Sequence, residues 1–343
     1  MAEMVFAAHD PGGALMLEAT RNAAQLRGHE LRFVGSGPAA SIWRRVGLEV
    51  CEVGPGSPYD KMVALPDLVV TGSGFGDFER NFWKWAQTRD CPTMAVIDSW
   101  TNMGRRFQVE GGFDFPHAIA VVDEDARSRL IADSGCDVPI FVTGQAHLQQ
   151  QTARLSQRRA MKLGVIDIPH LVFFSEPIDI DYGSKVRGFD QYEVFEQLCG
   201  VLDLQQTMHL EVKPHPRESW DRWQQLISNH KTTNNHRITI TEAPADELLV
   251  TIDGVLGMTS MVLLEAHLLG IPVLSLQPGR TSVVNAVLED NMRPVLHNGG
   301  MAASMVRFLD CLGTKSPVSP RTAKFLHDAD KRTVAAIETL IRN

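Results

Sequence analysis

The chain has 343 residues, of which 44% are hydrophobic and 22% charged, with a formal net charge of -8. This length predicts two domains of about 150 residues each, and the composition excludes a disordered chain. The acidic balance argues against nucleic acid or an anionic membrane as the principal partner, although it leaves room for a local basic site that binds a small anion.

The cysteines and the N-terminus favour a cytoplasmic protein. The five cysteines are spread along the chain without a CxxC pair, so neither a zinc site nor a disulfide framework is expected. The first residues, "MAEMVFAAHDPGG", lack the basic start and the long apolar run of a signal peptide. No apolar segment reaches the roughly 18 residues that a membrane helix needs.

The first half alternates short β-branched strands with helices. The expected strands are "MVFAA", "ELRFVGSG", "LEVCEV", "PDLVVTGSG", "PTMAVIDSW", "HAIAVV" and "PIFVTG", and helices such as "LMLEATRNAAQLRG" and "DFERNFWKWAQTRD" separate them. Buried strands alternating with helices predict a parallel, doubly wound α/β sheet. We therefore expect residues 1–150 to form a Rossmann-like domain.

The same pattern restarts after a polar helical segment at about 145–167. "PHLVFFSEP", "MHLEVKPHP", "RITITEA", "DGVLGM" and "IPVLSLQPG" are the expected strands of a second Rossmann-like domain, residues 165–318. The remaining residues, 319–343, predict one helix that packs back on the first domain. Two such domains facing across a cleft would bind ligands beyond the carboxyl ends of their strands.

A lysine and a histidine follow one strand of the second domain, each with a proline after it. Pro214 and Pro216 fix their own φ and bias Lys213 and His215 toward extended backbone. A lysine ammonium and an imidazole that donates from either ring nitrogen suit a phosphate. A proline-rich turn with a solvated lysine and a packed histidine explains this segment equally well.

Forty-odd residues later, "GMTSMVLLEAHLLGIPVL" predicts a turn, a helix and a strand. Thr259 and Ser260 would begin the helix, where free backbone N–H groups and the helix dipole attract an anion. Glu265 would lie about 7 Å further along the axis, a spacing that suits a carboxylate on ribose hydroxyls. An ordinary N-cap and a solvated glutamate are the structural alternatives.

These two motifs together resemble the nucleotide-sugar-binding domain of GT-B glycosyltransferases. The likeness is greatest to the subset with an HP motif, which includes bacterial sialyl- and capsule-sugar transferases and CDP-glycerol glycerophosphotransferases. The resemblance implies that Lys213, His215, Thr259 and Ser260 hold the donor phosphates and that Glu265 contacts ribose. It covers residues 205–280 at the level of motifs.

The non-hydrolysing UDP-N-acetylglucosamine 2-epimerases share this fold, and the chain departs from their pattern. Met258 to Met261 stand where those enzymes usually carry Asp-Ser-Gly-Gly, and Leu264-Glu265 replaces their paired glutamates. Their first loop contains an arginine, whereas this chain has His9-Asp10-Pro11. These departures favour a transferase, and an epimerase is kept as the alternative because of the shared fold.

In the first domain, "AAHDPGGA" follows the first strand. Gly12 and Gly13 would let the backbone approach a ligand, and His9 and Asp10 add a titratable pair. Inverting GT-B enzymes need a group that takes a proton from the acceptor hydroxyl, and Asp10 is the first candidate for this base and Asp98 of "VIDSW" the second. Ser175 and Glu176 in "FFSEP" are candidates for contacts with the donor sugar.

The sequence thus predicts a cytoplasmic, metal-independent GT-B glycosyltransferase without a cofactor. Its partners would be a UDP-, CDP- or CMP-linked sugar and a glycan or lipid-linked acceptor, and a homodimer is left open. Histidines 9, 117, 147, 170 and 267 lack the spacing of metal ligands. The alternatives are an epimerase or hydrolase, a CDP-alditol phosphotransferase, and a protein that binds a nucleotide sugar without converting it.

Overall fold

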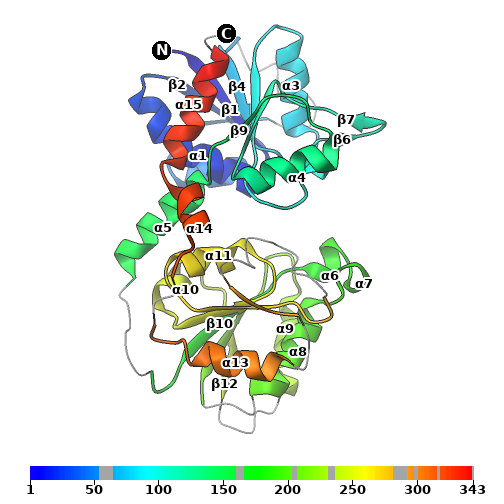
Figure 1. Ribbon diagram of the computed structural model, residues 1–343, viewed down its shortest axis with the longest axis vertical. Coiled ribbons are helices and arrows are strands. Elements are labelled where there is room, and N and C mark those ends of the chain that lie inside the picture. The colour runs from blue at the N-terminus through cyan, green and yellow to red at the C-terminus, as the bar shows by residue number, and fades with distance from the viewer. Residues whose placement is uncertain are drawn as a thin grey trace. The chain divides into compact units, whose positions relative to one another are not determined.

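The computed structural model describes residues 1–53, 65–159, 166–202, 207–230, 236–280, 292–296, 300–314 and 317–341. The chain divides into two compact units, each built on a parallel sheet (Figure 1). Unit 1 comprises Met1–Gln150 and Pro320–Asn343, and unit 2 comprises Gln151–Ser319. Two Rossmann-like α/β domains, as expected from the sequence, are thereby confirmed.

The sheet of unit 1 has the strand order β3-β2-β1-β4-β5-β8-β9. Its strands are β1 (Glu3–Ala8), β2 (Glu30–Gly35), β3 (Val50–Glu52), β4 (Leu68–Thr71), β5 (Thr93–Val96), β8 (Ala118–Val121) and β9 (Ile140–Val142). All residues of β4, β5 and β8 are buried, as expected for strands covered by helices on both faces. The order reverses between β1 and β4, and the loops that follow such neighbours diverge to leave a place for a ligand.

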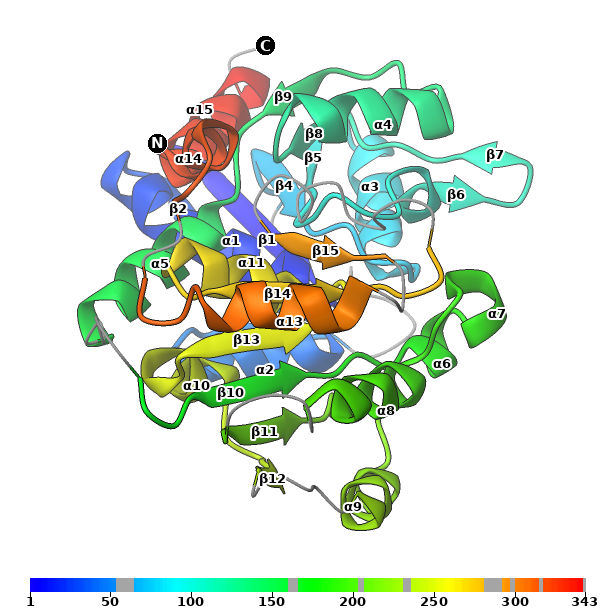
Figure 2. The ribbon, with the colours of Figure 1, turned by 60° about the horizontal axis from the view of Figure 1, so that its bottom comes forward.

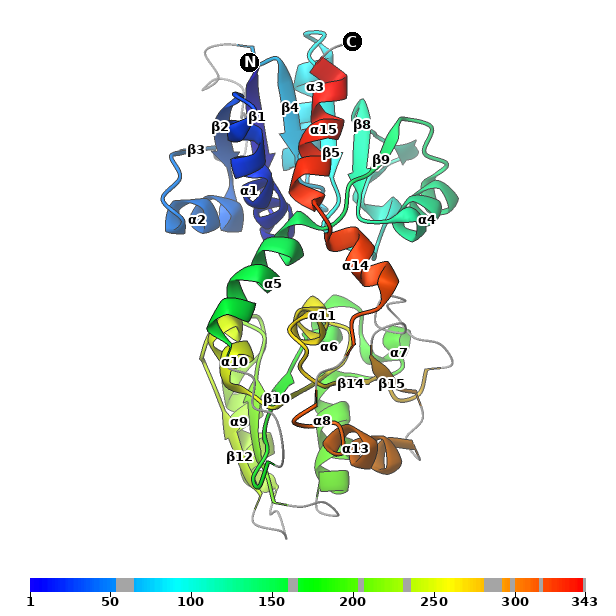
Figure 3. The same cartoon turned by 60° about the vertical axis from the view of Figure 1, so that its left-hand side comes forward.

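The helices of unit 1 include both ends of the chain. They are α1 (Pro11–Leu26), α2 (Gly37–Arg45), α3 (Phe78–Gln87), α4 (Glu124–Ser134), α14 (Pro320–Leu326) and α15 (Ala329–Ile341), with the first residues of α5 (Ala146–Arg158). Helix α15 lies along α1 (Figure 3), and Glu338 pairs with Arg27 at 2.6 Å and His29 at 3.0 Å. The C-terminal segment therefore completes the core of unit 1.

Some local features of unit 1 differ from the sequence expectation. The C-terminal segment forms two helices instead of one, because the chain turns at Asp328, whose φ is 50°. A short hairpin, β6 (Gln108–Val109) and β7 (Gly112–Phe113), and the 3-10 turn η2 (Gly104–Arg106) follow β5 and were not predicted. Residues 160–165 of the expected helical connection lie outside the described residues.

The sheet of unit 2 has the order β12-β11-β10-β13-β14-β15. Its strands are β10 (His170–Phe174), β11 (His209–Lys213), β12 (Arg237–Ile240), β13 (Gly254–Gly257), β14 (Val273–Leu276) and β15 (Arg293–Val295), of which β15 was not predicted. The order reverses between β10 and β13, so the loops after these two strands are the equivalent place in unit 2.

The helices of unit 2 cover both faces of this sheet (Figure 2). Phe173, Phe195 and Trp223 are fully buried and join the sheet to two of these helices. The helices are α6 (Ile178–Asp181), α7 (Ser184–Arg187), α8 (Gln191–Leu202), α9 (Trp220–Asn229), α10 (Ala245–Thr251), α11 (Met261–Leu268) and α13 (Met301–Leu309), with the rest of α5. Among the described residues, none of the helices is both long and apolar enough for a membrane span.

Candidate functional site

The loop after β1 presents an aspartate and a histidine at the start of α1. Asp10 precedes Pro11, the first residue of α1, but its side chain makes no capping hydrogen bond. Its Oδ1 lies 2.9 Å from Nδ1 of His9, and the side chains of Asp10 and His9 are 41% and 45% exposed. Asp10 therefore lies at the positive dipole end of a 16-residue helix.

The two glycines of this loop allow close packing within unit 1. A Cβ added to Gly12 would overlap the carboxylate of Asp98, and one added to Gly13 would lie 2.8 Å from the Cα of Gly72. The start of α1 therefore packs directly on the ends of β4 and β5. That contact accounts for both glycines, and their predicted approach to a ligand stays a prediction.

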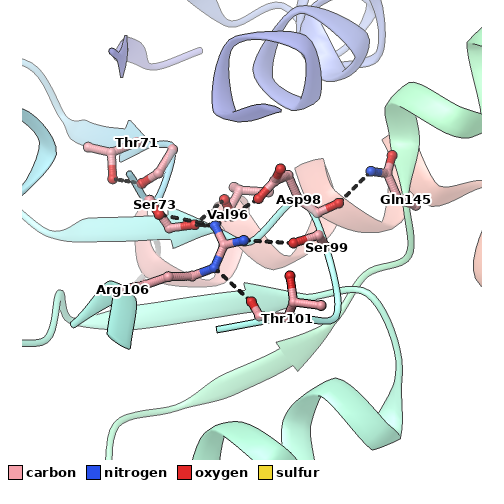
Figure 4. Close-up of polar contacts among 9 residues, drawn as sticks. Thr71, Ser73, Val96, Asp98, Ser99, Thr101, Arg106 and Gln145 are labelled. Carbon is pink, nitrogen blue, oxygen red and sulfur yellow. Dashed lines mark hydrogen bonds and ion pairs between the residues drawn. The ribbon is translucent and has the colours of Figure 1, made fainter. Parts of the chain in front are cut away.

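Asp98 follows β5 and is held by an arginine (Figure 4). Arg106 donates from Nη1 to Asp98 Oδ1 at 2.8 Å and to Ser73 Oγ at 2.9 Å, and from Nη2 to Ser99 Oγ at 2.7 Å. Gln145 Nε2 donates to the backbone carbonyl of Asp98 at 2.7 Å. This network ties together the ends of β4, β5 and β9 and pairs the charge of Asp98, so Asp10 is the more accessible of the two carboxylates.

A buried glutamate that the sequence did not single out lies below the loop after β1. Glu79, in the first turn of α3, is 2% exposed, and its Oε1 accepts a hydrogen bond from the His9 N–H at 2.8 Å. Burial raises the pKa of Glu79, and the nearby charge of Asp10 raises it further, against the lowering effect of the His9 hydrogen bond. Glu79 therefore belongs with His9 and Asp10 as a group of three titratable side chains.

In unit 2, Lys213 ends β11 and His215 lies in the loop that follows. Lys213 Nζ donates to the Glu242 carbonyl at 3.2 Å, and the His215 N–H donates to Glu218 Oε2 at 2.5 Å. Because His215 Nδ1 accepts from the Arg217 N–H at 3.2 Å, only Nε2 remains to donate, which corrects the expectation of two available nitrogens. Burial, Arg217 and Lys213 lower the pKa of His215, which favours a neutral donor.

The loop after β10 places a carboxylate on the start of α11. Glu176 accepts hydrogen bonds from the backbone N–H of Thr259 and, at 2.6 Å, from its hydroxyl. Burial raises the pKa of Glu176, while the hydrogen bonds from Thr259 and Ser260 and the charge of Arg187 lower it. Glu176 thus occupies the hydrogen-bond donors that the sequence analysis assigned to a phosphate. No feature of the sequence indicated this contact between Glu176 and Thr259.

The neighbouring serines have structural partners. Ser175 Oγ donates to Glu218 Oε1 at 2.7 Å, so Glu218 joins the loops after β10 and β11. Ser260 is the N-cap of α11, and its Oγ accepts from the Val262 N–H at 3.4 Å. Both serines lie at the predicted edge of the sheet, beside the groups that would bind an anion.

Glu265 projects from α11 toward α5 and α10. Burial and, to a smaller extent, the charge of Asp246 raise the pKa of Glu265 to about 7, against the lowering effects of Arg154 and of a hydrogen bond from Gln151. Arg154 and Gln151 also bind the Asp246 carboxylate. A titratable carboxyl group at this position is consistent with either a ribose contact or a structural role, and the ribose contact stays a prediction.

Two arginines missed by the sequence analysis flank the loop after β14. Arg187, at the end of α7, lies over the ring of Tyr182 with its guanidinium carbon 3.7 Å from the ring centroid. Arg280 Nη1 donates to the Arg187 carbonyl at 3.2 Å. With Lys213 and His215, these arginines give the carboxyl edge of this sheet several cationic or hydrogen-bond-donating groups.

A cluster at the opposite edge of the sheet corrects the expectation that His170 stands alone. His170, His209 and Glu211 have potential ligand atoms within 4.8 Å of one another, because His170 and His209 are paired in register at the amino ends of β10 and β11. His170 Nε2 lies 3.0 Å from Glu211 Oε1, and His209 Nε2 lies 2.9 Å from Thr239 Oγ1. Sequence spacing does not reveal this group, because the register of two strands creates it.

The fold has many counterparts among solved structures, although no protein-family model matches the chain and no curated protein resembles it in sequence. The UDP-GlcNAc 2-epimerase from Methanocaldococcus jannaschii has a TM-score of 0.69 at 14% identity, covering 98% of this chain and 99% of its own. A UDP-GlcNAc 2-epimerase from Neisseria meningitidis, bound to UDP-GlcNAc, has 0.67 at 11%, covering 99% and 100%. MurG from Acinetobacter baumannii has 0.56 at 10%, covering 98% and 99%. At these identities the likeness establishes the GT-B fold.

Proposed function

We propose that this protein is an enzyme of nucleotide sugars that transfers the sugar to a hydroxyl-bearing acceptor without a metal ion. The observation that carries the proposal is the state of Asp10, a carboxylate 41% exposed at a helix start and oriented by His9. Such a group can accept the proton of an acceptor hydroxyl as its oxygen bonds to the sugar carbon. The nucleotide leaves with the electron pair of the broken C–O bond.

Nucleotide binding is assigned to unit 2. Lys213 supplies a positive charge and His215 a neutral Nε2–H donor, while the N–H groups at the start of α11 become available when Glu176 releases them. These groups would stabilise the negative charge that develops on the leaving phosphate, the role a metal ion has in other enzymes. Glu265 would contact the ribose.

A second candidate is a 2-epimerase that acts on a UDP-linked sugar. It is favoured by one observation, since the TM-score to the epimerases reaches 0.69 while that to MurG is 0.56. The residues at the start of α11 and in the loop after β1 differ from the epimerase pattern, which favours transfer. In both proposals, Ser175 and Glu176 can contact the donor sugar only after Glu176 has left Thr259.

Incubation with UDP-, CDP-, CMP- and GDP-linked sugars separates these functions. We expect free nucleotide to be released in an acceptor-dependent manner and with undiminished rate in EDTA. A new sugar configuration seen by NMR without acceptor would establish the epimerase instead. Binding without any product would establish a nucleotide-sugar-binding protein and refute both enzymes.

A further inference from the structure

Glu79 is a buried carboxyl group with one oxygen engaged and the other unpaired. Oε1 accepts the His9 N–H, whereas Oε2 is buried and has no hydrogen-bond partner among the described residues. An ionised carboxylate in this position would bury a charge-bearing oxygen without a donor, which is costly. A protonated carboxyl group removes the cost, because the proton lies on Oε2 and turns it into a donor.

Asp10 is the candidate acceptor for that proton. A Cβ built on Gly74 would lie 2.6 Å from Asp10 Oδ2 and 3.1 Å from Glu79 Oε2, so both oxygens border the same point beside the Gly74 backbone. Asp10 Oδ1 is already engaged by His9 Nδ1 at 2.9 Å. The second oxygens of Asp10 and Glu79 therefore both border the Gly74 backbone, at a position where a side chain larger than glycine would overlap Asp10.

We propose that Glu79 is a positioning residue that retains a proton facing Asp10 and, through it, holds Asp10 in the orientation of a base. Two contacts that join these residues are present, from His9 Nδ1 to Asp10 and from the His9 N–H to Glu79 Oε1, and the proposed proton on Oε2 would supply the third, toward Asp10. This inference rests on the proposed function for the role of Asp10. The protonated state of Glu79 follows from its burial and contacts and does not depend on that function.

The other charges around Glu79 leave this assignment intact. Burial raises the pKa of Glu79 and Asp10 raises it further, whereas His9 lowers it. On α3 itself, Arg80 is paired with Asp77 at 2.9 Å. From the loop after β5, Arg106 is paired with Asp98 at 2.8 Å. Both cations thus have carboxylate partners other than Glu79.

The protonation of Glu79 has a consequence for stability that needs no substrate. The unfolded chain releases this proton near the ordinary pKa of glutamate, while the folded protein keeps it to higher pH. The stability that the protonated group provides is complete below the unfolded pKa and is lost as pH rises through the folded pKa. Glu79→Gln, which is always neutral, should therefore gain roughly 2–4 °C in Tm per pH unit over the native protein within that window.

The matched control is Glu110→Gln, which removes an acidic charge at an exposed position in the turn between β6 and β7. Its Tm difference from the native protein should stay constant between pH 5 and 8. A Tm difference for Glu79→Gln that is equally independent of pH would show that Glu79 is not held protonated and would overturn the proposal.

Turnover supplies the second readout. Glutamine keeps an acceptor for the His9 N–H and a donor toward Asp10, so Glu79→Gln should retain kcat within about threefold. Glu79→Ala removes both groups and should lose roughly 10–100-fold in kcat, with KM for the donor unchanged. Inactivity of the glutamine variant would mean that an ionised Glu79 is required, and full activity of the alanine variant would remove the positioning role. If the native protein converts no nucleotide sugar, the proposed function fails while the Tm comparison still decides the state of Glu79.

Discussion

Replacing Glu176 by glutamine should strengthen the binding of a nucleotide sugar. In the ligand-free protein the Glu176 carboxylate accepts hydrogen bonds from both the N–H and the hydroxyl of Thr259. A diphosphate on the same donors must displace this carboxylate or lie beside its negative charge. Glutamine keeps the size of the side chain and removes the charge.

The expected gain follows from the distance over which the two anions would repel each other. Two unit charges about 5 Å apart at an effective dielectric constant near 20 interact by about 3 kcal/mol. Arg187 reduces this repulsion, since its charge already lowers the pKa of Glu176. A net gain of about 1.4–2.8 kcal/mol corresponds to a tenfold to hundredfold lower Kd.

Calorimetry with a nucleotide sugar is the appropriate assay, because its diphosphate diester does not titrate above pH 5. At pH 8 the variant should bind more tightly than the native protein. Burial raises the pKa of Glu176, so the native protein should gain affinity as pH falls through this pKa and approach the variant. Any protonation of His215 is common to both proteins and cancels in the comparison.

Glu193→Gln, at an exposed position of α8, is the matched control and should leave the affinity unchanged. An equal or weaker affinity of Glu176→Gln at pH 8 would refute the competition. A loss confined to the nucleotide sugar, with the free nucleotide bound as before, would instead show that Glu176 contacts the sugar.

Three further predictions concern the remaining site residues. The double variant Lys213→Ala, His215→Ala should bind nucleotide tenfold to a hundredfold more weakly in calorimetry without a lower Tm, and unchanged affinity would remove both from the site. Glu265→Gln should weaken nucleotide binding but leave pyrophosphate binding intact, whereas equal losses would mean a structural role. Asp10→Asn should lower turnover about a hundredfold or more at unchanged donor affinity, and normal turnover of this variant would exclude Asp10 as the base. Asp98→Asn should in addition lower Tm, because it breaks the ion pair with Arg106.

The fold was predictable because its signal is local. Strands such as "LVVT" and "TMAV" are buried on both faces, so they appear in the sequence as continuous apolar runs between helices. The hairpin β6–β7 is largely exposed and gave no such signal. Strand β15 has only three residues and contains a proline, which argues against a strand in the sequence. The turn at Asp328 was missed because nothing in "FLHDADK" except the tolerance of aspartate for positive φ marks a helix end.

For the candidate site, the sequence predicted which residues lie at the ends of strands, but not which residues contact them. Each predicted residue lies where its own strand or helix places it, but the partners come from other elements. Glu79 reaches His9 from α3, Arg106 reaches Asp98 from the turn after β5, and Glu176 reaches Thr259 from the loop after β10. Such pairs depend on the order and register of strands in the sheet, which no periodicity within a single segment encodes.

The carboxylates of Asp10 and Glu176 both lie at the start of a helix, but their surroundings suit them to different roles. Asp10 precedes α1 without capping it and remains 41% exposed, so the hydroxyl of the proposed acceptor can reach it. Glu176 instead occupies the start of α11 from a distant loop, and its burial raises its pKa. The exposed carboxylate can accept a proton from a ligand, whereas the buried one satisfies the N–H groups that an incoming anion would use. In the proposed function, the start of α1 carries the base of unit 1, and the start of α11 forms an anion site whose affinity the ionisation of Glu176 would control.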